Sequence, residues 1–170
     1  MSGHSKPTRF HPIGSPLRHA GVIQERDHDA YKSRRKLPEP TLCPKCGAVF
    51  QEGRWQWAPK PQHAHETLCP ACHRIHDNFP AGYVHLAGDY FAQHRDELLH
   101  LVKNEGEREG SEHPLERIMA TEAEADGTLV TTTSIHLARR IGEALHHACQ
   151  GELEFRYNDE QDLLRVHWRR

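Results

Sequence analysis

The segments "CPKCG" (residues 43–47) and "LCPACHRIHD" (residues 68–77) decide the architecture of the first half of this chain. Each segment carries two cysteines separated by two residues, with a proline directly after the first cysteine. Proline fixes a tight turn whose backbone N–H groups can point at sulfur, and paired cysteines of this kind are typical of tetrahedral zinc sites. We therefore predict one zinc ion, held by Cys43, Cys46, Cys69 and Cys72.

The predicted zinc site is structural. Four thiolates close the coordination shell, so the ion ties two loops together and offers no open position to a substrate. The same four thiolates also suit iron, and the sequence does not distinguish the two metals. Cys149, the fifth cysteine, falls on the apolar stripe of a later predicted helix and is expected to be a small core residue.

The motif "CPACH" (residues 69–73) has other interpretations. Covalent haem attachment would leave the upstream cysteine pair without a role and would require an exported protein, and a redox pair would have to be free of metal. The segment also resembles the end of HNH endonucleases. Those enzymes need an Asp-His pair and an Asn, but residues 47–67 contain neither Asp nor Asn, and His63 and His65 lie close to Cys69. We interpret His73 as a neighbour of the site, and a metal-dependent nuclease stays as the alternative.

The bulk composition limits the class of protein. Only 36% of the 170 residues are hydrophobic and the mean hydropathy is -0.82, so there is little material for one large core. Small domains with thin cores commonly need a metal to hold them. No run of 18 apolar residues predicts a membrane span, and the N-terminus lacks the apolar stretch of a secretory signal. We expect a cytoplasmic protein, in which reduced cysteines favour metal binding.

Charge is distributed unevenly along the chain. Residues 1–42 hold eight Lys and Arg against four acids, whereas residues 95–126 hold four against ten. The first segment has no apolar period and is predicted to be a disordered basic arm that reaches toward a polyanion. Its phosphate-binding candidates in RNA are Arg9, Arg18, Lys32, Arg34, Arg35 and Lys36.

The rest of the chain predicts an α+β protein. Residues 43–106 comprise the zinc module and an amphipathic helix that starts near Asp89 and ends before Gly106, and residues 107–114 are an acidic linker. Residues 115–170 read as a ββαββ domain, with a hairpin turn at Asp126-Gly127 and a helix capped by Ser134. The last two strands alternate apolar and polar residues, as in a half-buried sheet.

Further RNA-binding candidates lie in both predicted units. Arg54, Trp57 and Lys60 fall between the cysteine pairs, where an aromatic ring among bases can stack on a nucleobase while charge is neutralised. Trp55 is close by, and one of the two tryptophans is expected to pack on the zinc loops. Arg139 and Arg140, on the later helix, are predicted to form a second docking face.

Several motifs together resemble a known family. The paired "CPKCG" and "LCPACHRI" knuckles, followed by "TTTSIHLARRIGEAL", look like the N-terminal region of the archaeal and eukaryotic adaptor for export of the large ribosomal subunit. The chain is more similar to short bacterial zinc-ribbon proteins related to that adaptor, through "PAG", "HRDELL", "EHPLERI" and "HLARRIGEAL" at residues 80–82, 94–99, 112–118 and 136–145. The resemblance covers about residues 40–170 and implies metal ligands at the four cysteines and association with the ribosome or rRNA.

From these observations we expect a non-enzymatic, zinc-containing RNA-binding protein that binds neither a membrane nor a small-molecule substrate. The resemblance implies a ribosome-associated factor of the stress or hibernation type, which occupies a functional site; a monomer is favoured. The chain has two cysteine pairs and stops at Arg170, so the export role of the larger family is not carried over. A zinc adaptor that binds a protein through the acidic segment 95–126 is a further alternative.

Overall fold

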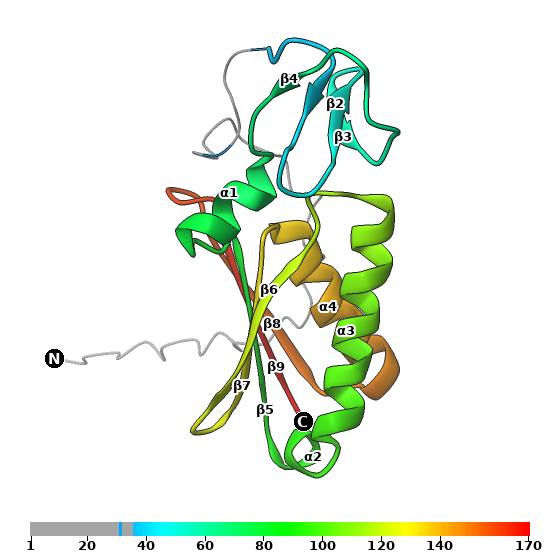
Figure 1. Cartoon of the computed structure of the whole chain (residues 1–170). Coiled ribbons are helices and arrows are strands. Elements are labelled where there is room, and N and C mark those ends of the chain that lie inside the picture. The colour runs from blue at the N-terminus through cyan, green and yellow to red at the C-terminus, as the bar shows by residue number, and fades with distance from the viewer. Residues whose placement is uncertain (1–30, 32–35) are drawn as a thin grey trace, which may run out of the picture.

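The computed structural model describes residue 31 and residues 36–170 (Figure 1). It contains two sheets and four α-helices within these residues, which confirms the α+β class. Most of the predicted basic arm, including Arg9, Arg18, Lys32, Arg34 and Arg35, lies outside the described residues. A small four-stranded unit sits at one end of a larger unit of one sheet and two long helices (Figure 1).

The small unit is the cysteine module. Its sheet has the order β3-β2-β1-β4, and one short helix, α1, follows it. The module starts at Thr41 rather than Cys43, because Thr41 and Leu42 pair with β2 on one side and with β4 on the other. The elements are β1 (Thr41–Leu42), β2 (Val49–Gln51), β3 (Arg54–Gln56), β4 (His65–Glu66) and α1 (Pro70–Asp77).

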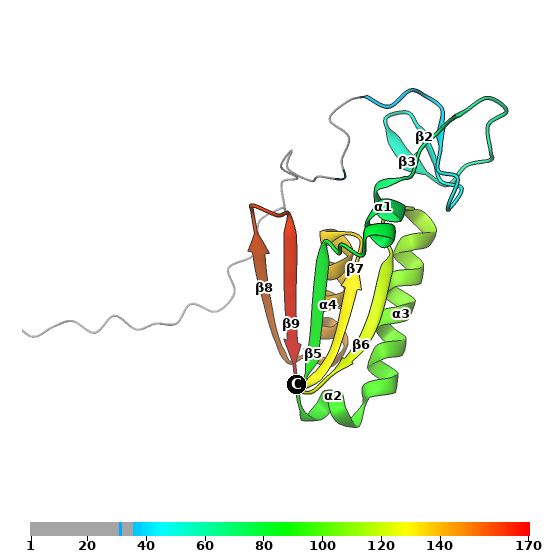
Figure 2. The same cartoon turned by 60° about the vertical axis from the view of Figure 1, so that its left-hand side comes forward.

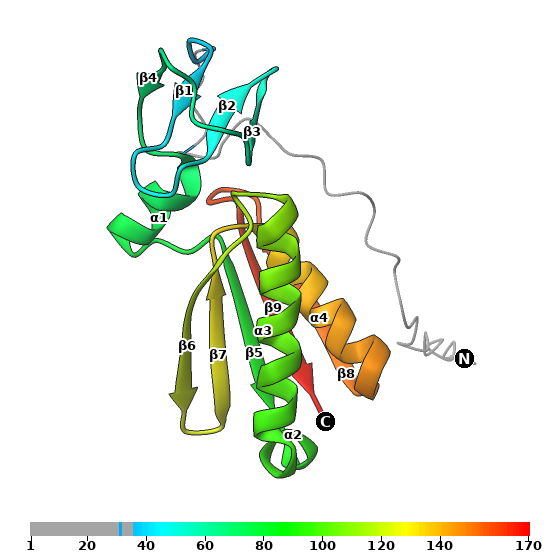
Figure 3. The same ribbon diagram turned by 45° about the vertical axis from the view of Figure 1, so that its right-hand side comes forward.

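The larger unit is a five-stranded sheet of order β6-β7-β5-β9-β8. Its central strand β5 runs parallel to β9 and antiparallel to β7. The strands are β5 (Gly82–Ala87), β6 (Ile118–Glu124), β7 (Gly127–Thr132), β8 (Glu152–Asn158) and β9 (Leu163–Arg169), and the helices are α2 (Asp89–Gln93), α3 (Arg95–Glu112) and α4 (Ile135–Cys149). Because α3 and α4 both cover the same face of the sheet, no helix among the described residues lies on the other face, which we call the open face (Figures 2 and 3).

The limits predicted for the second unit need correction in two places. The ββαββ segment 115–170 does not form the sheet alone, because β5 lies at its centre and buries Val84 and Leu86 in the shared core. Residues 107–112 of the predicted acidic linker belong to α3. Gly106 does not end that helix: a Cβ at this position would lie 2.5 Å from Cδ1 of Ile118, so the glycine permits close packing of β6.

Other expectations for the larger unit are confirmed. The hairpin turns at Asp126, Ser134 accepts a hydrogen bond from the backbone N–H of His136 at 3.1 Å as the N-cap of α4, and Gly151 follows that helix. The predicted inward residues of β9, Leu164, Val166 and Trp168, are buried. Of the α4 stripe, Ala148 is exposed, whereas Cys149 packs against the core as expected. No helix among the described residues is long and apolar enough to span a membrane.

Candidate metal centre

The four predicted ligands converge at one point of the small unit. The Sγ atoms of Cys43, Cys46, Cys69 and Cys72 all lie within 4.8 Å of one another. Those of Cys46 and Cys69 are 3.7 Å apart, close to the edge of a tetrahedron with Zn–S bonds of about 2.3 Å. Cys43 and Cys69 are fully buried, so the cluster is also the centre of the module's small hydrophobic core. The arrangement fits one structural zinc ion.

The first cysteine pair is placed by a tight turn between β1 and β2. The backbone N–H of Gly47 donates to the Cys43 carbonyl at 2.9 Å, and the N–H of Cys43 donates to the Ala48 carbonyl at 2.8 Å. Gly47 has φ +82°, a left-handed conformation that glycine adopts without steric cost. Gly47 therefore allows the tight turn that brings Cys43 and Cys46 to the same side of the module.

The second cysteine pair is placed by a helix terminus. Cys69 is the N-cap of α1, followed by Pro70, and its Sγ accepts a hydrogen bond from the Cys72 N–H at 3.4 Å. The backbone N–H of Cys69 in turn donates to Sγ of Cys43 at 3.3 Å, so a hydrogen bond joins the two cysteine pairs directly. Proline at the first helical position loses no hydrogen bond, because that N–H has no partner within the helix.

The electrostatics of the four thiols favour a cation. Burial raises the pKa of Cys43, but backbone N–H groups of Cys69, Cys46 and Lys45 outweigh it and bring the pKa to about 7. Burial, together with the neighbouring sulfurs, raises the pKa of Cys46 and of Cys69. Each deprotonated thiol makes deprotonation of its neighbours less favourable. A divalent ion bound among them compensates the negative charge and stabilises all of the thiolates.

Arg117 is a functional residue of this centre that the sequence does not reveal. It precedes β6 in the larger unit, and its Nη2 donates to Sγ of Cys69 and of Cys72, both at 3.3 Å. The residues are 48 and 45 positions apart in the chain, so no local pattern could have found the contact. Leu115 also packs against the cysteine cluster, which makes the connection from α3 to β6 part of the site.

One of the two tryptophans packs on the zinc loops, as expected. Trp55 packs against the cysteine cluster and meets Phe50 with ring centroids 5.6 Å apart. Trp57 is 43% exposed, and its Nε1 donates to the Gly110 carbonyl in α3 at 2.8 Å. The exposed face of Trp57 stays accessible while its nitrogen joins the two units.

The remaining RNA-binding candidates have different surroundings. Lys36, Arg54 and Lys60 are exposed on the small unit. Arg139 bonds to Glu143 at 2.8 Å and lies over the Phe155 ring, and Arg140 bonds at 3.1 Å to Glu109, a buried carboxylate of α3. Both arginines of α4 therefore have structural contacts of their own. Only the Arg140–Glu109 contact, between residues 31 positions apart, lacks a local sequence signal.

The histidines beside the cysteines are on the surface. His63, His65 and His73 are exposed, and none belongs to either of the two groups of side chains that could hold a metal ion among the described residues. His73 instead meets Tyr31 edge-on with ring centroids 5.5 Å apart. Tyr31 also donates to Asp77 at 3.0 Å and lies under the Arg74 guanidinium, so it contacts α1 at several points.

A scan against protein-family models, a search of curated proteins and a search of solved structures each yield no match.

Proposed function

We propose that this protein binds RNA at the ribosome without catalysing a reaction, and that a zinc ion at the four cysteines orders the binding surface. The observation that carries the proposal is the combination of a closed cysteine site with exposed basic and aromatic residues on the same module. Lys45 lies within the first knuckle, and Arg54, Trp57 and Lys60 are exposed on the segment between the two pairs.

The chemistry of these side chains suits a structured RNA. Arg54 and Lys60 can each neutralise a phosphate, and Trp57 offers an aromatic face to an unstacked base. The basic segment 1–42 adds eight Lys and Arg residues next to the module. A metal with four cysteine ligands would hold the loops without taking part in a reaction, which agrees with a protein that acts by occupying a site.

The ribosome as the partner rests on the resemblance to short bacterial zinc-ribbon proteins related to the subunit-export adaptor. On the same resemblance, we propose that the protein is a ribosome-associated factor of the stress or hibernation type. A cytoplasmic location follows from it, since ribosomes are found there.

Co-sedimentation of the tag-free protein with purified ribosomes at several salt concentrations tests the proposal. We expect binding that weakens steeply with salt, and a double change of Arg54→Gln and Lys60→Gln that reduces the salt slope by roughly two phosphate contacts. Lys103→Gln on α3, a lysine that pairs with Glu107 at 3.6 Å, is the matched control and should leave the slope unchanged.

Removal of residues 1–30 separates the arm from the module, because it spares both Tyr31 and β1. A shallower salt slope is expected. The absence of co-sedimentation at low salt would contradict the proposal, as would a complex that survives nuclease digestion of the RNA and points to a protein partner. Cleavage of RNA or plasmid that disappears in a His73→Ala variant would establish the nuclease alternative.

A further inference from the structure

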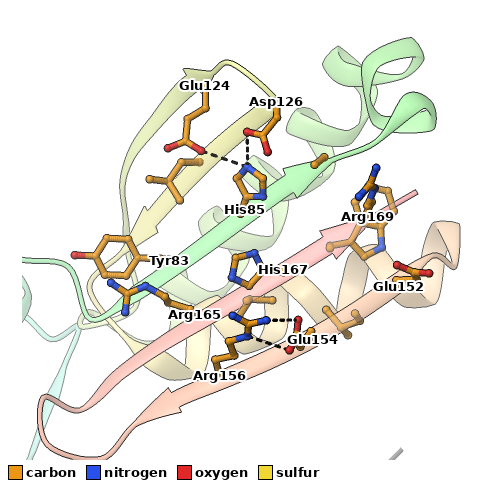
Figure 4. A pocket seen from close by; sticks show the side chains of 15 residues that line it. Tyr83, His85, Glu124, Asp126, Glu152, Glu154, Arg156, Arg165, His167 and Arg169 are labelled. Atoms are coloured by element: carbon orange, nitrogen blue, oxygen red, sulfur yellow. Dashed lines mark hydrogen bonds and ion pairs between the residues drawn. The ribbon is translucent and has the colours of Figure 1, made fainter. Parts of the chain in front are cut away.

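The open face of the five-stranded sheet carries a second cluster of metal-binding side chains. A shallow hollow of about 820 Å³ extends across it from β6 to β8 (Figure 4). At the centre of this face, Leu129, His85 and His167 lie opposite one another on β7, β5 and β9. Toward the β6–β7 turn, Glu124 and Asp126 flank His85.

Three potential ligand atoms converge beside the imidazole of His85. Its Nε2 is 3.3 Å from Oε2 of Glu124 and 3.2 Å from Oδ1 of Asp126. The His85 side chain is 19% exposed, and Figure 4 shows the ring edge directed at both carboxylates. The three donor atoms all lie within 4.8 Å of one another. One nitrogen and two oxygens from different parts of the sheet therefore face a common point.

The spacing suits a metal as well as it suits hydrogen bonds. Nitrogen and oxygen ligands bind zinc at about 2.0–2.1 Å, so two ligands at a tetrahedral centre are about 3.3 Å apart. The two measured distances from His85 have this length, which means that an ion can enter with little movement of the side chains. Glu124 and Asp126 are more exposed than His85, at 41% and 77%, so each can turn toward an ion.

The charge of the cluster also favours a cation. Among the described residues, His85 is the only basic side chain that pairs with either carboxylate, and no Lys or Arg contact is found for them. One imidazole can compensate at most one of the two negative charges, and none when it is neutral. A divalent ion would compensate both, and zinc, which accepts mixed nitrogen and oxygen ligands, fits this set.

The local fold builds the cluster through Gly127. A Cβ at Gly127 would lie 2.0 Å from the Leu86 carbonyl oxygen, so only glycine allows the β6–β7 turn to approach β5 this closely. The approach brings Asp126 next to His85, which is 41 residues away in sequence. His167, whose ring centroid is 5.7 Å from that of His85, is the nearest further imidazole on this face.

We propose that His85, Glu124 and Asp126 bind a second divalent metal ion, of the zinc type, on the open face of the sheet. Unlike the four-cysteine centre, this site supplies three protein ligands and leaves a position for water or for an oxygen atom of a bound molecule. The site does not depend on RNA binding and can be tested apart from it.

Metal content of the tag-free, full-length protein tests the site. After dialysis against buffer with defined free zinc, elemental analysis should give a second equivalent in addition to that of the cysteines. Glu124→Gln and Asp126→Asn should each lower the affinity for the second zinc ion by at least about tenfold, and His85→Asn should abolish its binding. Cobalt gives an independent signature, because the second equivalent should add no thiolate-to-cobalt charge-transfer absorption.

Two matched variants control for weak binding at the other histidines and acids. Glu122→Gln removes a charge from the same strand without removing a ligand, and His94→Ala removes an imidazole that pairs with a single carboxylate, Glu97, at 3.5 Å. Both should retain the second equivalent. Its absence in the unaltered protein, or an equal loss in either control, would overturn the proposal. The two carboxylate variants change exposed groups, so they decide the matter even if the His85 variant folds poorly.

Discussion

Arg117 connects the metal centre to the larger unit through a single guanidinium. Four thiolates around a zinc ion carry a net charge of about -2, and the two N–H···S bonds from Arg117 offset part of it in a site with little access to water. The Nε of Arg117 is buried without a hydrogen-bond partner. This placement of the guanidinium at the sulfurs therefore carries the desolvation penalty of one unpaired N–H group. Such a contact supports the metal without coordinating it.

Replacement of Arg117 should therefore increase the rate at which zinc dissociates from the four cysteines. We expect Arg117→Met to speed zinc transfer to a chromogenic chelator by about 10–100-fold, the range found for residues that support metal ligands. Arg117→Lys should recover only part of the effect, because an ammonium cannot make the same planar pair of bonds. Arg95→Met, which removes an exposed arginine from the other end of α3, is the control. Equal rates for Arg117→Met and the control would contradict the role.

Glu116, the neighbour of Arg117, should make stability depend on pH. Burial raises its pKa above the ordinary 4.5, its Oε1 accepts from Ser134 at 3.1 Å, and its Oε2 is buried without a partner. The folded protein thus binds this proton more tightly than the unfolded chain does, and stability is lost as pH rises from 4.5 through the raised pKa.

Glu116→Gln replaces the titratable carboxyl group with a neutral amide. The free energy of unfolding of the variant relative to the unaltered protein should increase across that pH window, by on the order of 1 kcal/mol at neutral pH. Urea unfolding of both proteins at a series of pH values measures the difference, which cancels the shared effect of cysteine protonation. A difference that is constant with pH would show that folding leaves the pKa of Glu116 unchanged.

Among the elements, α4 shows how closely the helices approach the sheet. A Cβ at Gly142 would lie 2.6 Å from Cγ1 of Val166 and 3.0 Å from Cδ1 of Leu153. Val166 is fully buried at the centre of β9, so it has no free space into which to move. The glycine in "HLARRIGEAL" is thus a packing requirement of the helix–sheet interface, although glycine lowers helix propensity.

We expect Gly142→Ala to destabilise the protein by about 1–3 kcal/mol, because overpacking exceeds the gain in helix propensity. His147→Ala, on the exposed side of the same helix, should change stability by less than about 0.5 kcal/mol. Chemical unfolding of both variants gives the comparison. A Gly142→Ala variant more stable than the parent would mean that the helix can shift away from β9.

Element boundaries were harder to predict than element types. The α4 region, the 118–132 hairpin and the final strand pair follow from periodicity, caps and a turn signal, and the structure confirms them. The sequence does not predict the central strand β5, because "GYVHLA" is short and its alternation becomes meaningful only beside β7 and β9. The predicted end of α3 is too early, because Gly106 resembles a helix stop signal but serves contact with Ile118.

At the scale of the whole molecule, the two units have separate cores. One consists of the cysteines with Ala48 and Ala71, and the other joins β5, β7 and β9 to α3 and α4. The bridge between them includes the Arg117–sulfur bonds, the Trp57–Gly110 bond and the contact of Leu115. The smaller core contains few large side chains, so a metal ion bound by the four cysteines would supply much of its cohesion.

Metal removal should therefore unfold only one unit. In hydrogen exchange after treatment with a strong chelator, we expect amides of residues 41–77 to lose protection while those of β5, β7 and β9 keep it. Readdition of zinc should restore the first set. Loss of protection throughout the sheet would show that the larger core also needs the cysteine centre.

The sequence by itself determined the two cysteine pairs, the types of most helices and strands, and the residues that start and end α4, because these depend on neighbours within a few positions. Only the tertiary structure decided which residues meet across long separations. It brings Arg117 to the sulfurs of Cys69 and Cys72, Arg140 to Glu109, and Asp126 to His85. Such contacts arise from strand order and helix packing, and no local spacing encodes them, so both the support of the metal centre and the second cluster become visible only in the folded chain.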